Sequence, residues 1–343
     1  MSRIDFLAAQ ALPRPVSAWQ ISKPFGARTL AVLALVLVLG FFAGQRVEMG
    51  RMLALTGEGV LASVGLRDRS QVLSGLETIG RSLFPPQISE RTEVARIEHF
   101  DRNQLPWLAH VESIESHQPR LNPDTLVMED VVARQEYLIE PLGYVRHVAA
   151  EMLETFEIAI WATLLAIVLS APLAWCGAKN YAPNRLVHTG ARAVVGLFRA
   201  VPELVSALFL VLAYGFGPIA GVLALALHST GFLGKFYADD IETADDKPQE
   251  ALRAIGANQF KVMRFAVLPQ VMPQFIAYTL YVLDRNVRMA TVVGLVGAGG
   301  IGQELKGRYD MYNYAHVGTI LIAIFVTVLL LDRIAARLRN RYV

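Results

Sequence analysis

The chain has 343 residues, of which 54% are hydrophobic and 18% are charged. Soluble domains carry about 25% charged residues, and the apolar residues here form blocks longer than a core helix needs, which excludes a purely soluble enzyme, a fibrous chain and a disordered chain. The net charge of +2 gives no global basic field for nucleic acid, and the single cysteine, Cys176, excludes an internal disulfide or a cysteine-rich metal cluster.

The first predicted membrane helix covers residues 29–44 and follows a basic arm, residues 1–28. Crossing a bilayer core of about 30 Å takes about 20 apolar residues, so this segment is short but can be extended by its flanks. A cleaved signal peptide is the alternative, because Ala43-Gly44-Gln45 offers small residues at a cleavage point. The arm is long for a signal peptide, which favours a retained anchor.

Residues 45–150 are predicted to form a long connection outside the cytoplasm. Residues 52–83 show helical apolar spacing and end at Phe84-Pro85-Pro86, whereas residues 90–148 are polar. The histidines in this connection match no compact metal-ligand spacing, so we expect solvated side chains and no metal site. They are His99, His110, His117 and His147.

Residues 151–336 hold five further predicted spans, which gives six membrane helices and an all-α polytopic fold. Lys and Arg are concentrated in the N-terminal arm, in residues 177–192, in residues 237–270 and in the tail, residues 337–343. Positive charge beside a span marks the cytoplasmic side, so both termini are predicted to be cytoplasmic. The five spans are Phe156–Cys176, Val194–Phe216, Pro218–Phe236, Val271–Leu283 and Val317–Leu331.

Residues 237–270 are predicted to contain a helical hairpin. Asp245 or Asp246 suits the N-cap of a first helix, and Gly256 suits the left-handed position that ends it. Asn258 can cap a second helix, which should end near Leu268-Pro269 because proline interrupts helices. A well-capped surface hairpin is the simplest interpretation of this pattern.

The same block also has the spacing of a known motif. Glu250-Ala251 is followed by Gly256 and, after nine further residues, by Ala266-Val267-Leu268-Pro269. This pattern resembles the EAA loop of ABC importer permeases, although two of its positions depart from the family form. The resemblance implies that this loop couples the chain to a separate ATPase. Its residues are Glu250, Ala251, Gly256, Leu268 and Pro269.

Further segments resemble the phosphonate-transport permease family and extend the resemblance from Glu151 to the C-terminus. It implies a MetI-like type I ABC importer permease of the bacterial inner membrane, with no catalytic residue and no cofactor. The implied partners are a second permease copy, identical or paralogous, cytoplasmic ATP-binding subunits and a periplasmic phosphonate-binding protein. Phosphite, phosphate or a small organic anion is the alternative solute. The segments are Leu153-Glu154-Thr155, Phe198–Leu204, Gly231–Lys235, Leu268–Gln274 and Asn286–Gly302.

The run Gly-Ala-Gly-Gly-Ile-Gly at residues 297–302 satisfies G-x-G-x-x-G. A nucleotide-binding interpretation requires a preceding strand and a βαβ unit, whereas this run lies between predicted membrane spans. Glycine permits close helix packing and bends. Packing and a gate lining therefore both stay open for Gly297, Gly299 and Gly300.

Asp284, Arg285 and Arg288 follow the fifth predicted span, where charge is costly and usually faces a cavity or a partner. Asp284 and Arg288 can pair at i, i+4, the region can reach outer water, or the arginines can line an oxyanion path. Arg199 and Glu203, also at i, i+4, are either an interface ion pair or part of an inner gate. The full predicted path comprises Arg199, Glu203, Arg285, Asn286, Arg288, Thr291, Gly297, Gly299 and Gly300.

A membrane-embedded enzyme and an autonomous channel or ion-coupled carrier are the rival classes. The spans contain no Ser/His/Asp set and no HExxH motif, which argues against an enzyme. His228, which ends an apolar helix face, is expected to be a packing residue. Uptake that persists without an ATPase partner would favour a channel or carrier.

Overall fold

The computed structural model describes residues 26–65, 70–98, 100–102, 105–106, 108–121 and 128–342. Two compact units meet at Ile79 and Gly80 in the sequence, and each is described by itself. Most of the predicted N-terminal arm and the predicted loop histidine His99 lie outside the described residues.

The first unit is built from helices that expose their apolar side chains. α1 (Ala27–Arg46) contains the predicted first span, and residues Thr29–Arg46 are long and apolar enough to cross a membrane. α2 (Met49–Ser63) and α3 (Gln71–Leu83) follow, with the last residues of α3 entering the second unit. The helical spacing predicted for residues 52–83 therefore corresponds to two helices.

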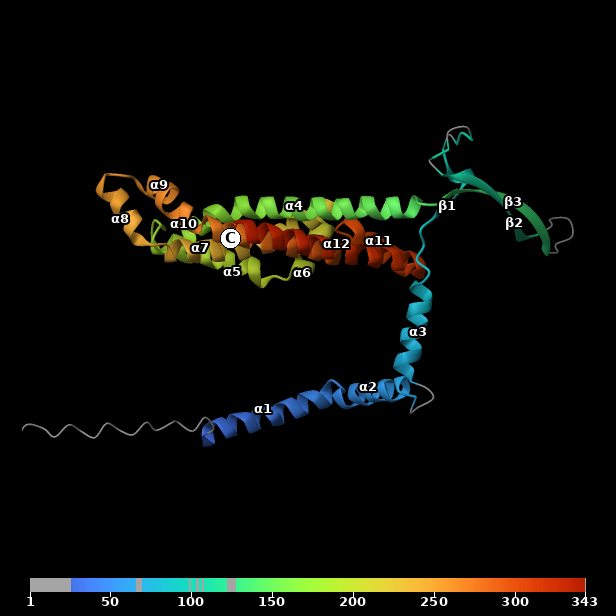
Figure 1. The fold of residues 1–343 in the computed structure, drawn as a ribbon, viewed down its shortest axis with the longest axis horizontal. Helices are drawn as coiled ribbons and strands as arrows, with labels where there is room; N and C mark the ends of the chain where they lie inside the picture. The colour runs from blue at the N-terminus through green and yellow to red at the C-terminus, as the bar shows by residue number, and fades with distance from the viewer. Residues whose placement is uncertain are drawn as a thin grey trace, which may run out of the picture. The chain divides into compact units, whose positions relative to one another are not determined.

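The second unit begins with a small antiparallel sheet that the helical prediction did not include. Its strand order is β1-β3-β2, with β1 at Glu90–Glu93, β2 at His110–Leu121 and β3 at Met128–Glu140. The polar residues of the long connection had been assigned to a loop, but β2 and β3 pair along their whole length, from His110 opposite Ile139 to Leu121 opposite Met128. Figure 1 shows the sheet leading into α4.

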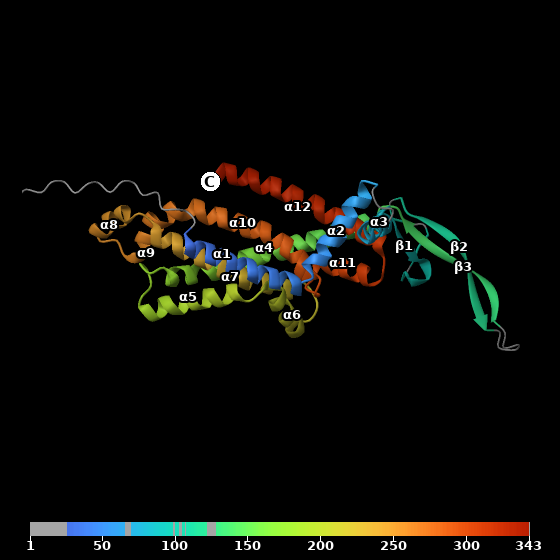
Figure 2. The same cartoon turned by 90° about the horizontal axis from the view of Figure 1, so that it is seen from below.

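Helices α4 and α7 form the centre of the second unit and lie side by side in both views (Figures 1 and 2). α4 covers Gly143–Gly177 and α7 covers Pro218–Thr243. They pack through small residues, including the fully buried Ala162 and Ala224, because small side chains let helix backbones approach closely in lipid. With 35 residues, α4 is about 52 Å long and begins well before the predicted start at Phe156.

The third predicted span is not a single helix. The structure divides it into α5 (Arg185–Ala200) and α6 (Glu203–Tyr214), which are bent by 88° at the break between them. Pro202 explains the break, because proline has no N–H for the helical ladder and biases the residue before it away from helical dihedral angles. The described residues thus contain five candidate spans, or six if the bent pair counts as one.

Helix α10 (Leu268–Gly294) continues past the predicted end of the fifth span at Leu283. The sequence-based boundary was wrong because it treated the following charges as a terminus, whereas α10 carries them inside a continuous helix. α11 (Gly300–Asp310) and α12 (Tyr314–Tyr342) complete the unit. The predicted tail is helical through residue 342 rather than separate from the last span.

The glycine run is a packing element between α10 and α11. Gly297 and Gly300 have φ angles of +92° and +66°, a region that glycine adopts without strain. The N–H of Gly300 donates to Glu154 Oε1 at 3.0 Å, and the N–H of Ile301 donates to Thr155 Oγ1 at 2.9 Å. Two side chains of α4 therefore satisfy the free N–H groups at the start of α11, which favours the packing interpretation.

Gly302 and Gly190 offer a matched test of this packing. A Cβ atom at Gly302 would overlap the Thr291 carbonyl oxygen, whereas a Cβ at Gly190 would meet nothing within 4 Å. We expect Gly302→Ala to lower the free energy of unfolding by about 1–3 kcal/mol through overpacking. We expect Gly190→Ala to leave it unchanged or raise it by about 0.5 kcal/mol. Thermal unfolding of the purified protein in detergent measures both, and equal stability of the two variants would contradict the close packing.

Candidate functional site

The predicted hairpin is present at one end of the helical bundle (Figure 1). Its first arm is α8 (Asp246–Ala254), and the side chain of Asp245 caps it by accepting a hydrogen bond from the Lys247 N–H at 3.0 Å. Gly256 follows with a φ angle of +84°. The prediction that Asp245 or Asp246 begins a short helix and that Gly256 ends it is therefore confirmed.

The second arm continues into α10 without ending at Leu268-Pro269. Asn258 accepts a hydrogen bond from the Lys261 N–H at 2.9 Å and so caps α9 (Gln259–Val262). A π turn, Met263–Val267, then joins α9 to α10. The predicted stop was wrong because the wider turn precedes Pro269, which lies in the first turn of α10 where its missing N–H is tolerated.

A buried glutamine fixes the hairpin to the rest of the bundle. Gln249 is fully buried, and its Oε1 accepts a 2.6 Å hydrogen bond from the hydroxyl of Tyr181, in the loop after α4. Burial raises the pKa of the Tyr181 phenol above its ordinary value, so the hydroxyl stays a neutral donor. Gln270 closes the base of the hairpin, since its Oε1 accepts from the Asp245 N–H at 2.9 Å. Sequence analysis assigned no role to these three residues, although Gln249 and Gln270 directly adjoin Glu250 and Pro269.

The surface of the hairpin combines the predicted coupling residues with exposed apolar side chains. Glu250, Ala251, Gly256 and Pro269 are exposed, while Leu268 packs against the core cluster beside α7. Three large apolar side chains expose 63–79% of their maximum solvent-accessible surface. They are Ile255, Phe260 and Phe265. The sequence pattern did not predict this exposure.

At the break between α5 and α6, three helices bring ionisable groups together. Glu203 of α6 forms an ion pair with Arg285 of α10, and its Oε1 lies 3.4 Å from His228 Nε2 of α7. The predicted alternative of an Arg199–Glu203 pair on one helix does not apply, because Arg199 ends α5 and Glu203 begins α6 on the other side of the bend. The alkyl chain of Arg199 instead packs against Gly231.

The remaining predicted path residues divide between pairing and packing. Arg288 is exposed and donates to Asp284 Oδ2 at 2.6 Å, which is the predicted i, i+4 pair. Asn286 is 1% exposed and bonded at 3.0 Å to both Ser229 and Thr163. It therefore cross-links α4, α7 and α10 within this chain and does not present its side chain to a lumen.

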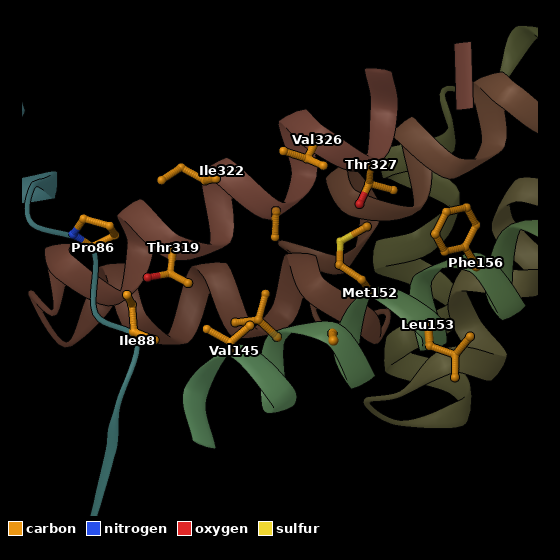
Figure 3. Close-up of a pocket in the computed structure, with 13 residues that line it drawn as sticks. Pro86, Ile88, Val145, Met152, Leu153, Phe156, Thr319, Ile322, Val326 and Thr327 are labelled. Atoms are coloured by element: carbon orange, nitrogen blue, oxygen red, sulfur yellow. The ribbon is translucent and has the colours of Figure 1, made fainter. Parts of the chain in front are cut away.

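An apolar pocket of about 570 Å³ lies between α4, α12 and the segment before the sheet (Figure 3). Its lining includes Met152, Phe156, Ile322 and Val326, with Thr319 donating to the Gln87 carbonyl. It contains no charged side chain and so does not suit an oxyanion. Among the described residues, no group of three or more His, Cys, Asp or Glu side chains is placed to hold a metal ion.

Five candidate spans, or six if the bent pair counts as one, are the features of a polytopic membrane protein. The family model described as "Binding-protein-dependent transport system inner membrane component" matches residues 166–343. The chain belongs to this family of inner membrane transport components.

Three relatives of the chain are named for the transport of phosphite or phosphate. The chain is 55% identical over 261 residues to HtxE of Stutzerimonas stutzeri, named as a phosphite transport system permease protein. This match covers 76% of the present chain and 100% of HtxE. The chain is 44% identical to the phosphite transport system permease protein PtxC of the same organism, over 56% of this chain and 70% of PtxC. It is also 43% identical to the phosphate-import permease protein PhnE of Mycolicibacterium smegmatis, over 55% of this chain and 36% of PhnE.

The fold resembles that of an ABC transporter whose structure has been solved. An inward-facing structure of the MetNI methionine ABC transporter matches with a TM-score of 0.50 and 19% identity, over 57% of this chain and 96% of that chain. The expected type I importer permease fold is therefore confirmed.

The Tyr181–Gln249 hydrogen bond gives a prediction for the rigidity of the hairpin. We expect Tyr181→Phe to remove about 1 kcal/mol of stabilisation, so amide hydrogen exchange across residues 246–262 should be about fivefold faster. Tyr309→Phe is the control, because Tyr309 is 57% exposed on α11. Unchanged exchange in the Tyr181 variant would show that this bond does not hold the hairpin.

Proposed function

We propose that this chain is the permease subunit of an ABC importer for phosphite, phosphonate or a related phosphorus oxyanion. The observation that carries the proposal is the 55% identity to HtxE over the whole length of that protein. The similarity to PtxC and to the M. smegmatis PhnE supports the same chemical class. A permease for a small organic anion is the second candidate. The apolar pocket between α4 and α12 favours neither candidate, because it offers no cationic group to any anion.

The coupling hairpin, residues 245–270, is proposed to bind a separate cytoplasmic ATP-binding subunit. Exposed apolar side chains at the ends of a short helix are the usual anchors of a helix that enters a groove, and Ile255, Phe260 and Phe265 provide them here. Gln249 and Gln270 would pass a displacement of the hairpin to Tyr181 and to the start of α10. ATP hydrolysis then belongs to the partner subunit.

A second permease chain is proposed to complete the conduit. α6 exposes Leu208, Phe209 and Leu212, and the partly exposed charges near its start need protein or water beside them. A periplasmic binding protein would deliver the solute to the outer face. The basic flanks support a cytoplasmic location of the hairpin and of both termini.

Reconstitution tests the substrate class directly. The chain is incorporated into liposomes with its ATPase subunits and binding protein, and uptake of phosphite, methylphosphonate and phosphate is compared with uptake of sulfate. We expect uptake of at least one phosphorus oxyanion to require ATP and to exceed sulfate uptake by about tenfold or more. Uptake that proceeds without the ATPase subunits would support a channel or carrier instead.

Gly256 tests the mechanical role of the hairpin. Its φ of +84° suits glycine, and asparagine tolerates this region far better than a β-branched residue does. Gly256→Val is therefore expected to abolish substrate-stimulated ATP hydrolysis and uptake, while the protein still inserts in the membrane. Gly256→Asn, the control, is expected to keep most of both. Normal stimulated hydrolysis and uptake in the valine variant would contradict the coupling role.

A further inference from the structure

Glu203, His228 and Arg285 form a compact charged cluster contributed by three different helices. The Glu203 carboxylate accepts from Arg285 and lies 3.4 Å from His228, whose Nδ1 is 3.3 Å from the Val201 carbonyl oxygen at the α5–α6 break. The side chains are 12%, 16% and 23% exposed for Glu203, His228 and Arg285, so the cluster is enclosed without being sealed.

The cluster lies well inside α7 and α10, two helices that are candidate membrane spans. The start of α7 and the end of α10 are adjacent, because the Gly217 N–H donates to the Gly297 carbonyl at 3.0 Å. His228 is ten residues into α7 and Arg285 is nine residues before the end of α10, which places both about 15 Å from that shared end. This distance is half of a hydrocarbon core of about 30 Å. Ionised groups at that depth are costly and commonly mark a solute path.

Arg285 and Arg288, the two arginines of α10 in this region, are both paired with carboxylates in the described conformation. Arg285 is paired with Glu203, and Arg288 is paired with Asp284. An oxyanion that approached Arg285 would therefore meet a guanidinium already bound to a carboxylate. Arg285 can hold such an anion only when Glu203 releases it.

We propose that the Glu203 carboxylate competes with the transported anion for binding to the Arg285 guanidinium. In this exchange, the oxygens of a phosphite or phosphonate replace the Glu203 carboxylate on the Arg285 guanidinium, beside His228. Carboxylates and phosphorus oxyanions present similar oxygens to the planar donor fork of arginine. The inference rests on the proposed function and adds to it a binding site in the permease itself.

The position of Glu203 permits the exchange. It occupies the first turn of α6, directly after the 88° bend, so α6 can turn relative to α5 without breaking hydrogen bonds inside either helix. The N-terminus of α6 still stabilises the carboxylate after it leaves Arg285, because the helix dipole favours negative charge there. The returning carboxylate displaces the anion, which keeps binding weak enough for release, as conduction requires.

The experiment measures anion binding to the purified permease–ATPase complex without binding protein. Phosphite and methylphosphonate are titrated against the complex and followed by phosphorus NMR line broadening. We expect Glu203→Gln to bind at least about fivefold more tightly than the parent and Arg285→Gln to lose binding. Asp284→Asn is the control for the loss of one negative charge. It removes the partner of Arg288 but leaves the pair between Glu203 and Arg285 intact, so it should give a smaller gain.

Two further variants separate competition from a structural ion pair. In Glu203→Gln/Arg285→Gln, two amides can still hydrogen-bond, so normal uptake would show that the native pair is only a tie between helices and would overturn the proposal. Glu203→Asp, whose shorter side chain holds Arg285 less well, should bind the anion more tightly than the parent, and unchanged affinity would count against competition. If the parent complex neither binds nor transports any phosphorus oxyanion, the proposed function itself fails.

Discussion

Hydrocarbon offers no water to an ionised side chain or to an unpaired backbone group, and the second unit of this protein is organised around that constraint. The chain breaks at Val201-Pro202, inside a stretch apolar enough to span. The Glu203 carboxylate, just after the break, accepts a hydrogen bond from Arg285 of α10. The Val201 carbonyl oxygen, at the break, lies 3.3 Å from His228 Nδ1 of α7. The same solution recurs at the start of α11, where Glu154 and Thr155 of α4 satisfy backbone N–H groups. At both of these breaks, neighbouring helices supply the partners.

Apolar run length was sufficient to predict the helical class and six spans, a number that the described residues reach if the bent pair counts as one. The capping residues predicted where the two arms of the hairpin begin. The ends of the spans were harder to predict, because polar residues on α4 and α10 resembled helix termini. In α4, His147 lies 3.4 Å from Glu304, and Arg308 donates to the same carboxylate at 2.7 Å. Burial opposes ionisation of Glu304, but this hydrogen bond and the charge of Arg308 outweigh it and hold its pKa below the ordinary value. His147 and Glu304 lie more than a hundred residues apart in the sequence, so no local pattern reveals their contact.

The sequence predicted many residues of the candidate site, but it did not predict which of their side chains contact one another. Glu203 and Arg285 were both predicted as site residues. Their pairing depends on the bend after α5, and the sequence predicted a continuous third span without that bend. Asn286 was placed on the path because of its neighbours, whereas its partners Thr163 and Ser229 make it a buried link between helices. The sheet escaped prediction because β2 is mostly polar and because neither β2 nor β3 has the regular apolar alternation of a half-buried strand.

The π turn at Met263–Val267 determines how the hairpin is rotated about the axis of α10. A π turn contains one residue more than an α turn, and each residue of an α-helix advances by about 100° around the axis. Everything before Met263 is consequently rotated by roughly that angle from where an uninterrupted helix would carry it. The face that the hairpin exposes at this end of the bundle is thus decided by a local change in winding, independently of the side chains displayed on it.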